Sequence, residues 1–350
     1  LSVSSAARPA AHGCRHRHRS SMSLPILHAD SPATGLRIGY EHAPAQSLLG
    51  EPDVLAVIGF GTGAAVSEDA RVLRVGLEPV HAASVEVWRV AGPSRHRRAG
   101  ALRWSCGGDY LFVAIELEED ACGGITAASE HAYRSLIAFV TGSPMPHLLR
   151  LWNYLDAINL GDGDAERYRL FCAGRARGMR DGADRHFPAA TAIGRQDGVR
   201  TLQVYGLASR HAGTPVENPR QVSAWHYPRR YGPIAPTFAR GTLTAASQLL
   251  ISGTAAVVGH VSQHPGDLAA QVGETWENLH SLAGHAGVGD RDFPARSLLK
   301  VYLRNAADAG ALARMLAGRT PAPAGLLTLA GDICRRELLV EIDGAHRVNA

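Results

Sequence analysis

Between residues 36 and 118, short apolar runs alternate with polar turns. The runs include "VLAVIGF", "SVEVWRV" and "YLFVAIELE", and glycine, proline and charged residues separate them. Runs rich in β-branched and aromatic residues that end at turn signals are typical of β-strands. Apolar residues then recur at helical intervals, which predicts helices over 125–140, 148–160 and 165–179. The segment "RTLQVYGLAS" predicts another strand after them.

The C-terminal part of the chain has the clearest pattern. A strand is predicted at Leu249–Gly259, and an amphipathic helix follows at Asp267–Ala283. The strand "SLLKVYLR", a helix at Ala306–Ala317 and the strand "ELLVEIDGAH" complete the series. Because amphipathic helices bury one face only, we expect an α+β fold in which two helices pack on one face of a sheet. We find no internal repeat in the sequence.

Changes in composition divide the chain into four predicted parts. Residues 1–35 read as a disordered or mis-assigned extension, since "MSLPILHAD" from Met22 opens a more ordinary start. Residues 36–210 are expected to form an N-terminal α+β domain, and residues 242–350 a C-terminal one. The segment 211–241 between them is rich in proline, arginine and glycine, which is typical of a junction loop. We expect this loop to line the site.

Composition excludes several classes of function. The 350 residues carry a formal net charge of +4, and the main basic stretch is short, at Arg15, Arg17 and Arg19, so we expect no nucleic-acid partner. No apolar run reaches the roughly 18 residues that span a bilayer, and we expect no membrane insertion. The five cysteines are odd in number and widely spaced, which indicates a reducing cytoplasm.

Neither a metal nor a cofactor is expected. His260 and His264 lie four residues apart but lack a third ligand for a metal. The glycine-rich run Gly59–Gly63 lacks the spacing of a dinucleotide-binding loop, and we interpret it as a turn.

The C-terminal block resembles the YjgF/RidA family in the sequence of its strands and helices. The matching residues are Ser252, Gly253, Gln271, Asn278, Leu279, Val340, Glu341 and Ile342. Such residues mostly maintain turns and packing, so this resemblance implies a fold more than a function.

A sharper resemblance is to the chorismatases, which add an N-terminal domain of about equal size to such a module. It rests on "LLRLWNYLDAIN", "YRLFCAGRA", "YPRRYGPIAPTFARG", "SGTAAVVGH…HPGDLAAQVGETWENL" and "DICRRELLVEID", which occur in the expected order. This resemblance implies that the N-terminal half has a related architecture. It also implies release of pyruvate from chorismate, with 3-hydroxybenzoate as the product, and 4-hydroxybenzoate as an alternative or additional product.

Chorismate carries two carboxylates and an enolpyruvyl ether, so its site needs cations and an acid. Arginine offers the forked geometry that carboxylates prefer, and Arg150, Arg175 and Arg240 each lie within a matched stretch. We expect two of them to bind the carboxylates. The alternative for each is a structural ion pair with a nearby aspartate.

Glu341 is the strongest candidate for the acid. It stands among apolar strand residues, and burial there raises the pKa of a carboxyl group because it disfavours the charged form. By resemblance to chorismatases, Glu341 protonates the methylene carbon of the enolpyruvyl group to give an oxocarbenium ion. The alternative is a strand glutamate that faces solvent.

Three further residues are expected at the substrate. The hydroxybenzoate-forming chorismatases resemble this chain in having cysteine at the Cys334 position and glycine at the Gly241 position. We interpret Cys334 as shaping the pocket and not as a nucleophile, with a small buried side chain as the alternative. Tyr231 offers a phenolic hydroxyl group that donates a hydrogen bond to the substrate, and a purely structural role is the equally good alternative.

Two other functions stay open at this point. One is a RidA-type imine deaminase. A resemblance to those enzymes implies an arginine shortly before the final strand, and Pro321–Leu329, which occupies that region here, contains none. The other is a non-catalytic module that binds an aromatic acid. A monomer is expected, because two related modules in one chain make within that chain the contact that single-module relatives make between the subunits of a trimer. A trimer is the alternative.

Overall fold

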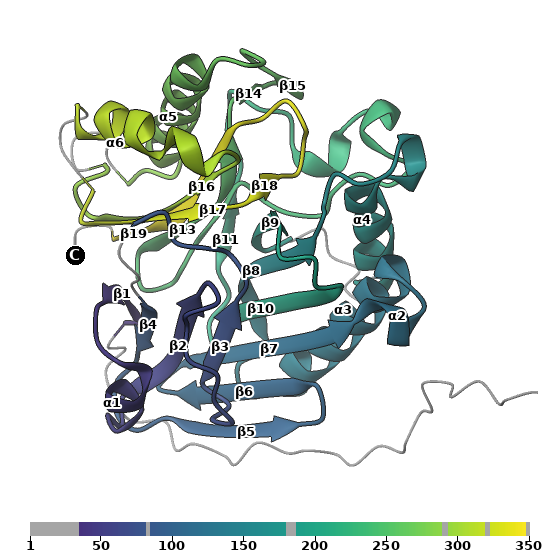
Figure 1. The fold of residues 1–350 in the computed structure, drawn as a ribbon. Helices are drawn as coiled ribbons and strands as arrows, with labels where there is room; N and C mark the ends of the chain where they lie inside the picture. Colours follow the sequence, from purple (N-terminus) through teal and green to yellow (C-terminus); the bar gives the residue numbers. More distant parts are fainter. Residues whose placement is uncertain (1–34, 82–84, 180–186, 289–292, 319–322, 348–350) are drawn as a thin grey trace, which may run out of the picture.

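Three β-sheets surround one hydrophobic core (Figure 1). The computed structural model describes residues 35–81, 85–179, 187–288, 293–318 and 323–347. The predicted extension at residues 1–35 therefore lies outside the described residues, apart from its last residue.

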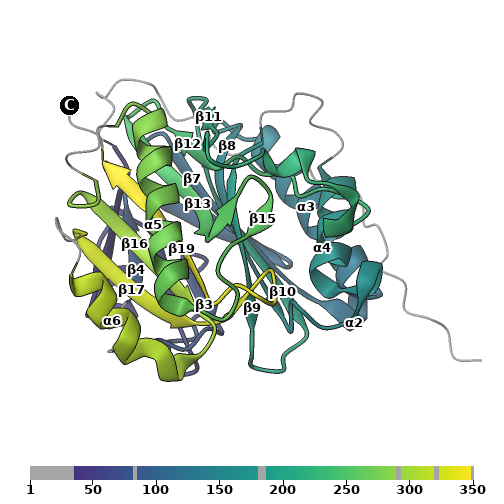
Figure 2. The ribbon, with the colours of Figure 1, turned by 90° about the horizontal axis from the view of Figure 1, so that it is seen from above.

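The C-terminal sheet has the predicted form, with two helices on one face (Figure 2). Its strand order is β11 (Thr214–Val216), β12 (Gly241–Leu243), β13 (Gln248–Ala255), β19 (Val340–Arg347), β16 (Ser297–Leu303) and β17 (Gly325–Ala330). The helices are α5 (Leu268–His285) and α6 (Ala309–Ala317), and the ribbon β14 (Val257–Val258) with β15 (Val261–Ser262) extends from this module. Strand β17, parallel to β16, was not expected.

The N-terminal sheet repeats this architecture, as the resemblance implied. Its strand order is β18 (Asp332–Ile333), β9 (Ala189–Arg195), β8 (His147–Asp156), β10 (Thr201–Ser209), β7 (Tyr110–Glu118), β6 (Leu102–Gly107) and β5 (Arg95–Ala99). The helices α2 (Glu119–Cys122), α3 (Ile125–Thr141) and α4 (Arg167–Gly178) belong to it. The order β7-β10-β8-β9 corresponds to β13-β19-β16-β17, and in both sheets the last pair is parallel.

The predicted helix at 148–160 is wrong, because these residues form most of the central strand β8. The strand is buried on both faces: Trp152 and Tyr154 face the central core, whereas Leu151 and Leu155 face the core beneath α3 and α4. A strand buried on both faces lacks the alternation of apolar and polar residues that identifies half-buried strands.

A third, smaller sheet repeats the pattern once more. It consists of β1 (Arg37–Glu41), β4 (Val85–Arg89), β2 (Val54–Phe60) and β3 (Val72–Val75), with the short helix α1 (Ala45–Leu49). The order β1-β4-β2-β3 again has two antiparallel pairs and then a parallel pair. The fold thus contains a threefold repeat of strand order that the sequence does not reveal.

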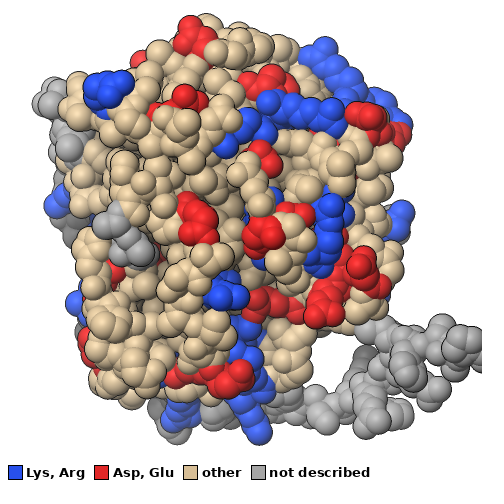
Figure 3. All heavy atoms as spheres, viewed as in Figure 1, with Lys and Arg blue, Asp and Glu red and all other residues tan. Residues whose placement is uncertain are grey.

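The surface shows no single-sign region on the face in Figure 3, where acidic and basic side chains are interspersed. Among the described residues, no helix is both long and apolar enough to cross a bilayer.

Candidate active site

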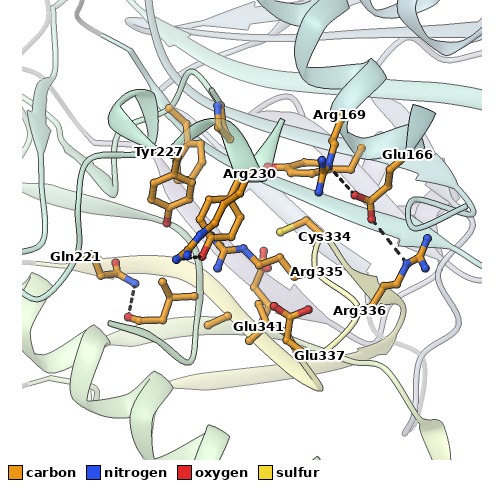
Figure 4. Close-up of a pocket in the computed structure, with 18 of the residues that line it drawn as sticks. Glu166, Arg169, Gln221, Tyr227, Arg230, Cys334, Arg335, Arg336, Glu337 and Glu341 are labelled. Carbon is orange, nitrogen blue, oxygen red and sulfur yellow. Dashed lines mark hydrogen bonds and ion pairs between the residues drawn. The ribbon is translucent and has the colours of Figure 1, made fainter. Parts of the chain in front are cut away.

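A cavity of about 420 Å³ lies where the N-terminal and C-terminal sheets meet (Figure 4). Its lining residues come from the segments 161–169, 221–240, 253–257 and 334–338, together with Glu341 of β19. The segment 221–240 belongs to the predicted junction loop and contains the short 3-10 helices Ala224–His226 and Arg229–Tyr231. Both modules therefore contribute to the cavity.

Glu341 is the buried acid of this cavity. On β19 it lies between Ala255 of β13 and Tyr302 of β16, and only 5% of its surface is exposed. Burial raises the pKa of Glu341 to about 8, and the neighbouring carboxylate of Asp343 acts in the same direction. At neutral pH the carboxyl group is mostly protonated and is able to donate a proton.

Gly253 provides the space that the Glu341 carboxyl group occupies. A Cβ atom at this position would lie 1.9 Å from Oε1 of Glu341, far inside van der Waals contact. Gly253 lines the cavity and belongs to β13. Sequence analysis noted Gly253 only as a fold residue, whereas Gly241 was expected at the substrate.

Gly241 itself lies outside the cavity lining. A Cβ atom there would approach Leu249 and the main-chain oxygen of Leu250, which are packing contacts within the sheet. Gly253, twelve residues further along, lines the cavity instead.

Arg150 also lies outside the lining, beneath Glu341. It is fully buried on β8, where Nη2 lies 3.2 Å from Oδ2 of Asp343 and donates to Oγ1 of Thr191. The guanidinium lies 4.5 Å from the ring centroid of Trp152. This is the structural ion pair that sequence analysis left open, and the positive charge of Arg150 lowers the pKa of Glu341.

Arg240 and Arg335 are the guanidinium groups that face Glu341. Both lower its pKa, which opposes the effect of burial. Arg240 donates to the hydroxyl of Tyr227 at 2.6 Å, and its Nε atom is buried without a hydrogen-bond partner. Arg335 lies 4.1 Å from the ring centroid of Tyr231 and donates to the main-chain oxygen of His260. Sequence analysis predicted Arg240 and missed Arg335, although "DICRRELLVEID" contains it.

Tyr231 lines the cavity beside Tyr227. Its hydroxyl accepts a hydrogen bond from Arg230 at 3.2 Å and lies 3.4 Å from Nδ1 of His260. The phenol is thus held by an arginine and a histidine.

Arg175 has no place in the cavity wall. It is buried on α4, donates to the main-chain oxygen of Thr237 at 2.8 Å and lies over the ring of Tyr133. Pro236 and Phe238, on either side of Thr237, line the cavity. The hydrogen bond from Arg175 therefore connects α4 to the junction loop at the cavity wall.

Cys334 lines the cavity, and burial raises the pKa of its thiol. The nearby Glu341 acts in the same direction. A thiol with a raised pKa stays protonated and is a poor nucleophile, which agrees with a role in shaping the pocket.

The mouth of the cavity carries charged side chains that sequence analysis did not single out. Arg169 pairs with Glu166, and Arg336 with Asp162. In the described part of the chain, no group of three or more histidine, cysteine and acidic residues is arranged to hold a metal ion.

Comparison with known proteins supports one family over the whole fold. The family model described as chorismatase FkbO/Hyg5-like, N-terminal, matches residues 86–208. A 3-hydroxybenzoate synthase from Streptomyces hygroscopicus is 35% identical over 276 residues, which are 74% of this chain and 80% of the relative. A chorismatase from Streptomyces rapamycinicus is 34% identical over 333 residues, covering 89% of this chain and 98% of the relative.

The crystal structure of a chorismatase superposes with a TM-score of 0.80 at 31% identity. The match covers 91% of this chain and all of that one. Sequence and structure thus agree along most of the chain, and the protein belongs to the chorismatase family.

Proposed function

We propose that this protein converts chorismate to 3-hydroxybenzoate and pyruvate, with Glu341 as the catalytic acid. The observation that carries this proposal is a buried carboxyl group, its pKa raised to about 8 by burial, that lines a cavity together with Arg240 and Arg335. A group that holds its proton at neutral pH is suited to protonate a vinyl-ether carbon.

Arg240 and Arg335 are proposed to bind the carboxylates of the substrate. Both line the cavity, and the Nε atom of Arg240 has a free N–H in a buried position. A buried N–H without a partner costs free energy, which a bound carboxylate removes. Each such charge-assisted contact contributes about 1.5–3 kcal/mol.

The reaction begins when the Glu341 carboxyl group gives its proton to the methylene carbon of the enolpyruvyl group. The electron pair of the double bond forms the new C–H bond, and the positive charge on the adjacent carbon is shared with the ether oxygen. The ring hydroxyl group at C4 then attacks this carbon and releases its proton, which gives a cyclic ketal with the ether oxygen at C3. The bond between C4 and its oxygen breaks, this oxygen becomes the keto oxygen of pyruvate as the bond between the pyruvate carbon and the C3 oxygen breaks, and the C3 oxygen takes up a proton. C3 loses its hydrogen as a proton when the ring becomes aromatic, so the phenol oxygen of 3-hydroxybenzoate is the former ether oxygen. The two products contain all the atoms of chorismate, so no water is consumed.

The product is proposed on the cavity shape and on the relatives. One similar protein is a 3-hydroxybenzoate synthase, and Cys334 and Gly253 line the cavity next to Glu341. Chromatography of the products from chorismate separates 3-hydroxybenzoate from the 4-isomer and tests this assignment.

Replacing Glu341 tests the proposed acid. We expect Glu341→Gln to lower the rate of pyruvate release from chorismate by about 100-fold or more, because the amide cannot donate the proton. Glu337→Gln is the matched control, since Glu337 lines the mouth of the same cavity but is exposed. Its rate should stay within about threefold of the wild type. Equal rates for both variants would remove Glu341 from the mechanism, whereas a wild type that releases no pyruvate would favour a non-catalytic module.

The assembly state and the compartment are also proposals. Three sheets of one chain already enclose the core, as three separate subunits would, so we infer a monomer. Cys106, Cys172 and Cys334 are free thiols, which fits a reducing compartment such as the cytoplasm.

A further inference from the structure

A second cavity, of about 460 Å³, lies where the N-terminal sheet meets the small sheet. In Figure 1 this is the region where β3 lies beside β10, β7 and β6. Its lining includes the turn after β2, which contains the glycine-rich run noted in the sequence, and the exposed Val66. None of these residues belongs to the cavity of Glu341.

The walls of the two cavities come from equivalent segments of the repeated fold. In the cavity of Glu341, the neighbouring module supplies residues 161–169 after β8, and here the small sheet supplies residues 61–68 after β2. The connection that precedes β19 corresponds to the connection between β9 and β10. The junction loop between β11 and β12 corresponds to the short turn between β5 and β6, and Arg98 and Arg103 on either side of that turn line the second cavity.

The strand register shows which single residues of the N-terminal and C-terminal modules are equivalent. Glu341 on β19 lies opposite Ala255 of β13 and Tyr302 of β16. In the N-terminal module, Gln203 on β10 lies opposite Glu116 of β7 and Tyr154 of β8.

Tyr154 and Tyr302 support this register, because their hydroxyl groups meet in the central core, 3.0 Å apart. Residues directly opposite on paired strands share a face of the sheet. Gln203 therefore occupies in the second cavity the position that Glu341 occupies in the first.

The second cavity is rich in guanidinium groups. Four arginines line it, against three acidic residues: Arg74, Arg98, Arg103, Arg195, Glu68, Glu116 and Asp197. The side chain of Arg195 is only 4% exposed, and its Nε atom has no hydrogen-bond partner. The Nε atom of Arg98 is in the same state. Burial lowers the pKa of both Arg103 and Arg195, whereas the neighbouring Glu116 and Asp197 act in the opposite direction.

We propose that the cavity beside Gln203 is a second binding site, which takes an organic carboxylate of about the size of a hydroxybenzoate and does not transform it. The arginines supply the contacts to the carboxylate, and the apolar side chains of Val66 and Val72 supply a surface for the rest of the ligand. The amide of Gln203 donates to Glu116 and to the main-chain oxygen of Arg74 and has no acidic proton to transfer. The site binds without catalysis for this reason.

Calorimetric titration of the full chain with 3-hydroxybenzoate tests the proposal. The wild type should bind two equivalents, one in each cavity. Ala65→Trp fills the second cavity and Arg74→Glu reverses a charge in its wall, and both positions are exposed, so the fold should tolerate either change. Each variant should lose one equivalent or weaken it by about tenfold or more, and its rate of pyruvate release should be unchanged.

Arg97→Glu is the control for the change of charge, because Arg97 is an exposed residue of β5 that does not line the cavity. It should keep both equivalents. A single equivalent on the wild type overturns the proposal. Two equivalents of unchanged affinity on both Ala65→Trp and Arg74→Glu overturn it as well.

Discussion

At Glu341, opposing effects set the strength of the acid. Burial and the carboxylate of Asp343 raise its pKa, whereas the guanidinium groups of Arg150, Arg240 and Arg335 lower it. The charge of Arg150 is shared with Asp343, at 3.2 Å, so it only partly favours ionisation of Glu341. The resulting pKa of about 8 keeps most Glu341 carboxyl groups protonated at neutral pH and still allows the proton to leave.

The pH dependence of the reaction follows from this value. The acid must be protonated, so kcat/KM for chorismate should be level below pH 8 and should fall by about tenfold per pH unit above it. Initial rates of pyruvate release between pH 6 and 10 measure this profile. A rate that increases through pH 8 would instead mean that Glu341 acts as a base.

Gly253 should be essential for placing the acid. In Gly253→Ala the new methyl group collides with Oε1 of Glu341, so the carboxyl group must move and kcat should fall by about tenfold or more. Gly273→Ala on α5 is the control, because a Cβ there meets nothing within 4 Å and alanine favours the helix. If Gly253→Ala and Gly273→Ala turn over chorismate at the wild-type rate, the close approach has no functional role.

At the scale of elements, the sequence predicted well wherever one face of an element meets solvent. Helices α3 and α5 were predicted to within two residues at each end because their apolar residues lie on one face. Strand β8 was read as a helix because both its faces are buried. The threefold repeat of strand order could not be detected in the sequence, because equivalent positions carry chemically different residues. Glu341 and Gln203 are one such pair, and the residues opposite them, Ala255 and Glu116, are another.

The site was predictable only in part for a similar reason. Glu341, Cys334, Tyr231 and Arg240 line the cavity, and all four lie in stretches that resemble one family. Arg150 and Arg175 lie in such stretches too, but they bind Asp343 and Thr237. Whether an arginine faces a cavity or the protein interior depends on the packing of α4 and β8 against other segments, which the local sequence does not contain.

The contact between α4 and the junction loop gives a prediction for Arg175. In Arg175→Met the loop loses its tether at Thr237, so the cavity wall should loosen and KM for chorismate should rise by about three- to tenfold, with a smaller change in kcat. Arg177→Met on the same helix is the control, because Arg177 is half exposed. A fall in kcat of about 100-fold with unchanged KM would instead mean that Arg175 contacts the reacting substrate.

At the scale of the whole molecule, the three sheets meet around a core that contains ionised groups. Lys300, the only lysine of the chain, is 1% exposed and pairs with Glu86 of the small sheet. Oε1 of Glu86 also accepts a hydrogen bond from the indole of Trp88 at 2.8 Å. This pair joins the small sheet to the C-terminal sheet, so its removal should affect how the three sheets stay together.

Lys300→Met keeps most of the side-chain volume but leaves the carboxylate of Glu86 buried without its cation. We expect the free energy of unfolding in urea to fall by about 3–5 kcal/mol, the usual cost of an uncompensated buried charge. The double variant Lys300→Met with Glu86→Gln removes both charges, and the amide oxygen still accepts from Trp88. It should regain most of the lost stability, because a neutral pair avoids the desolvation that the single variant suffers. If the double variant is as unstable as Lys300→Met, the ammonium group stabilises the core by packing and not by neutralising Glu86.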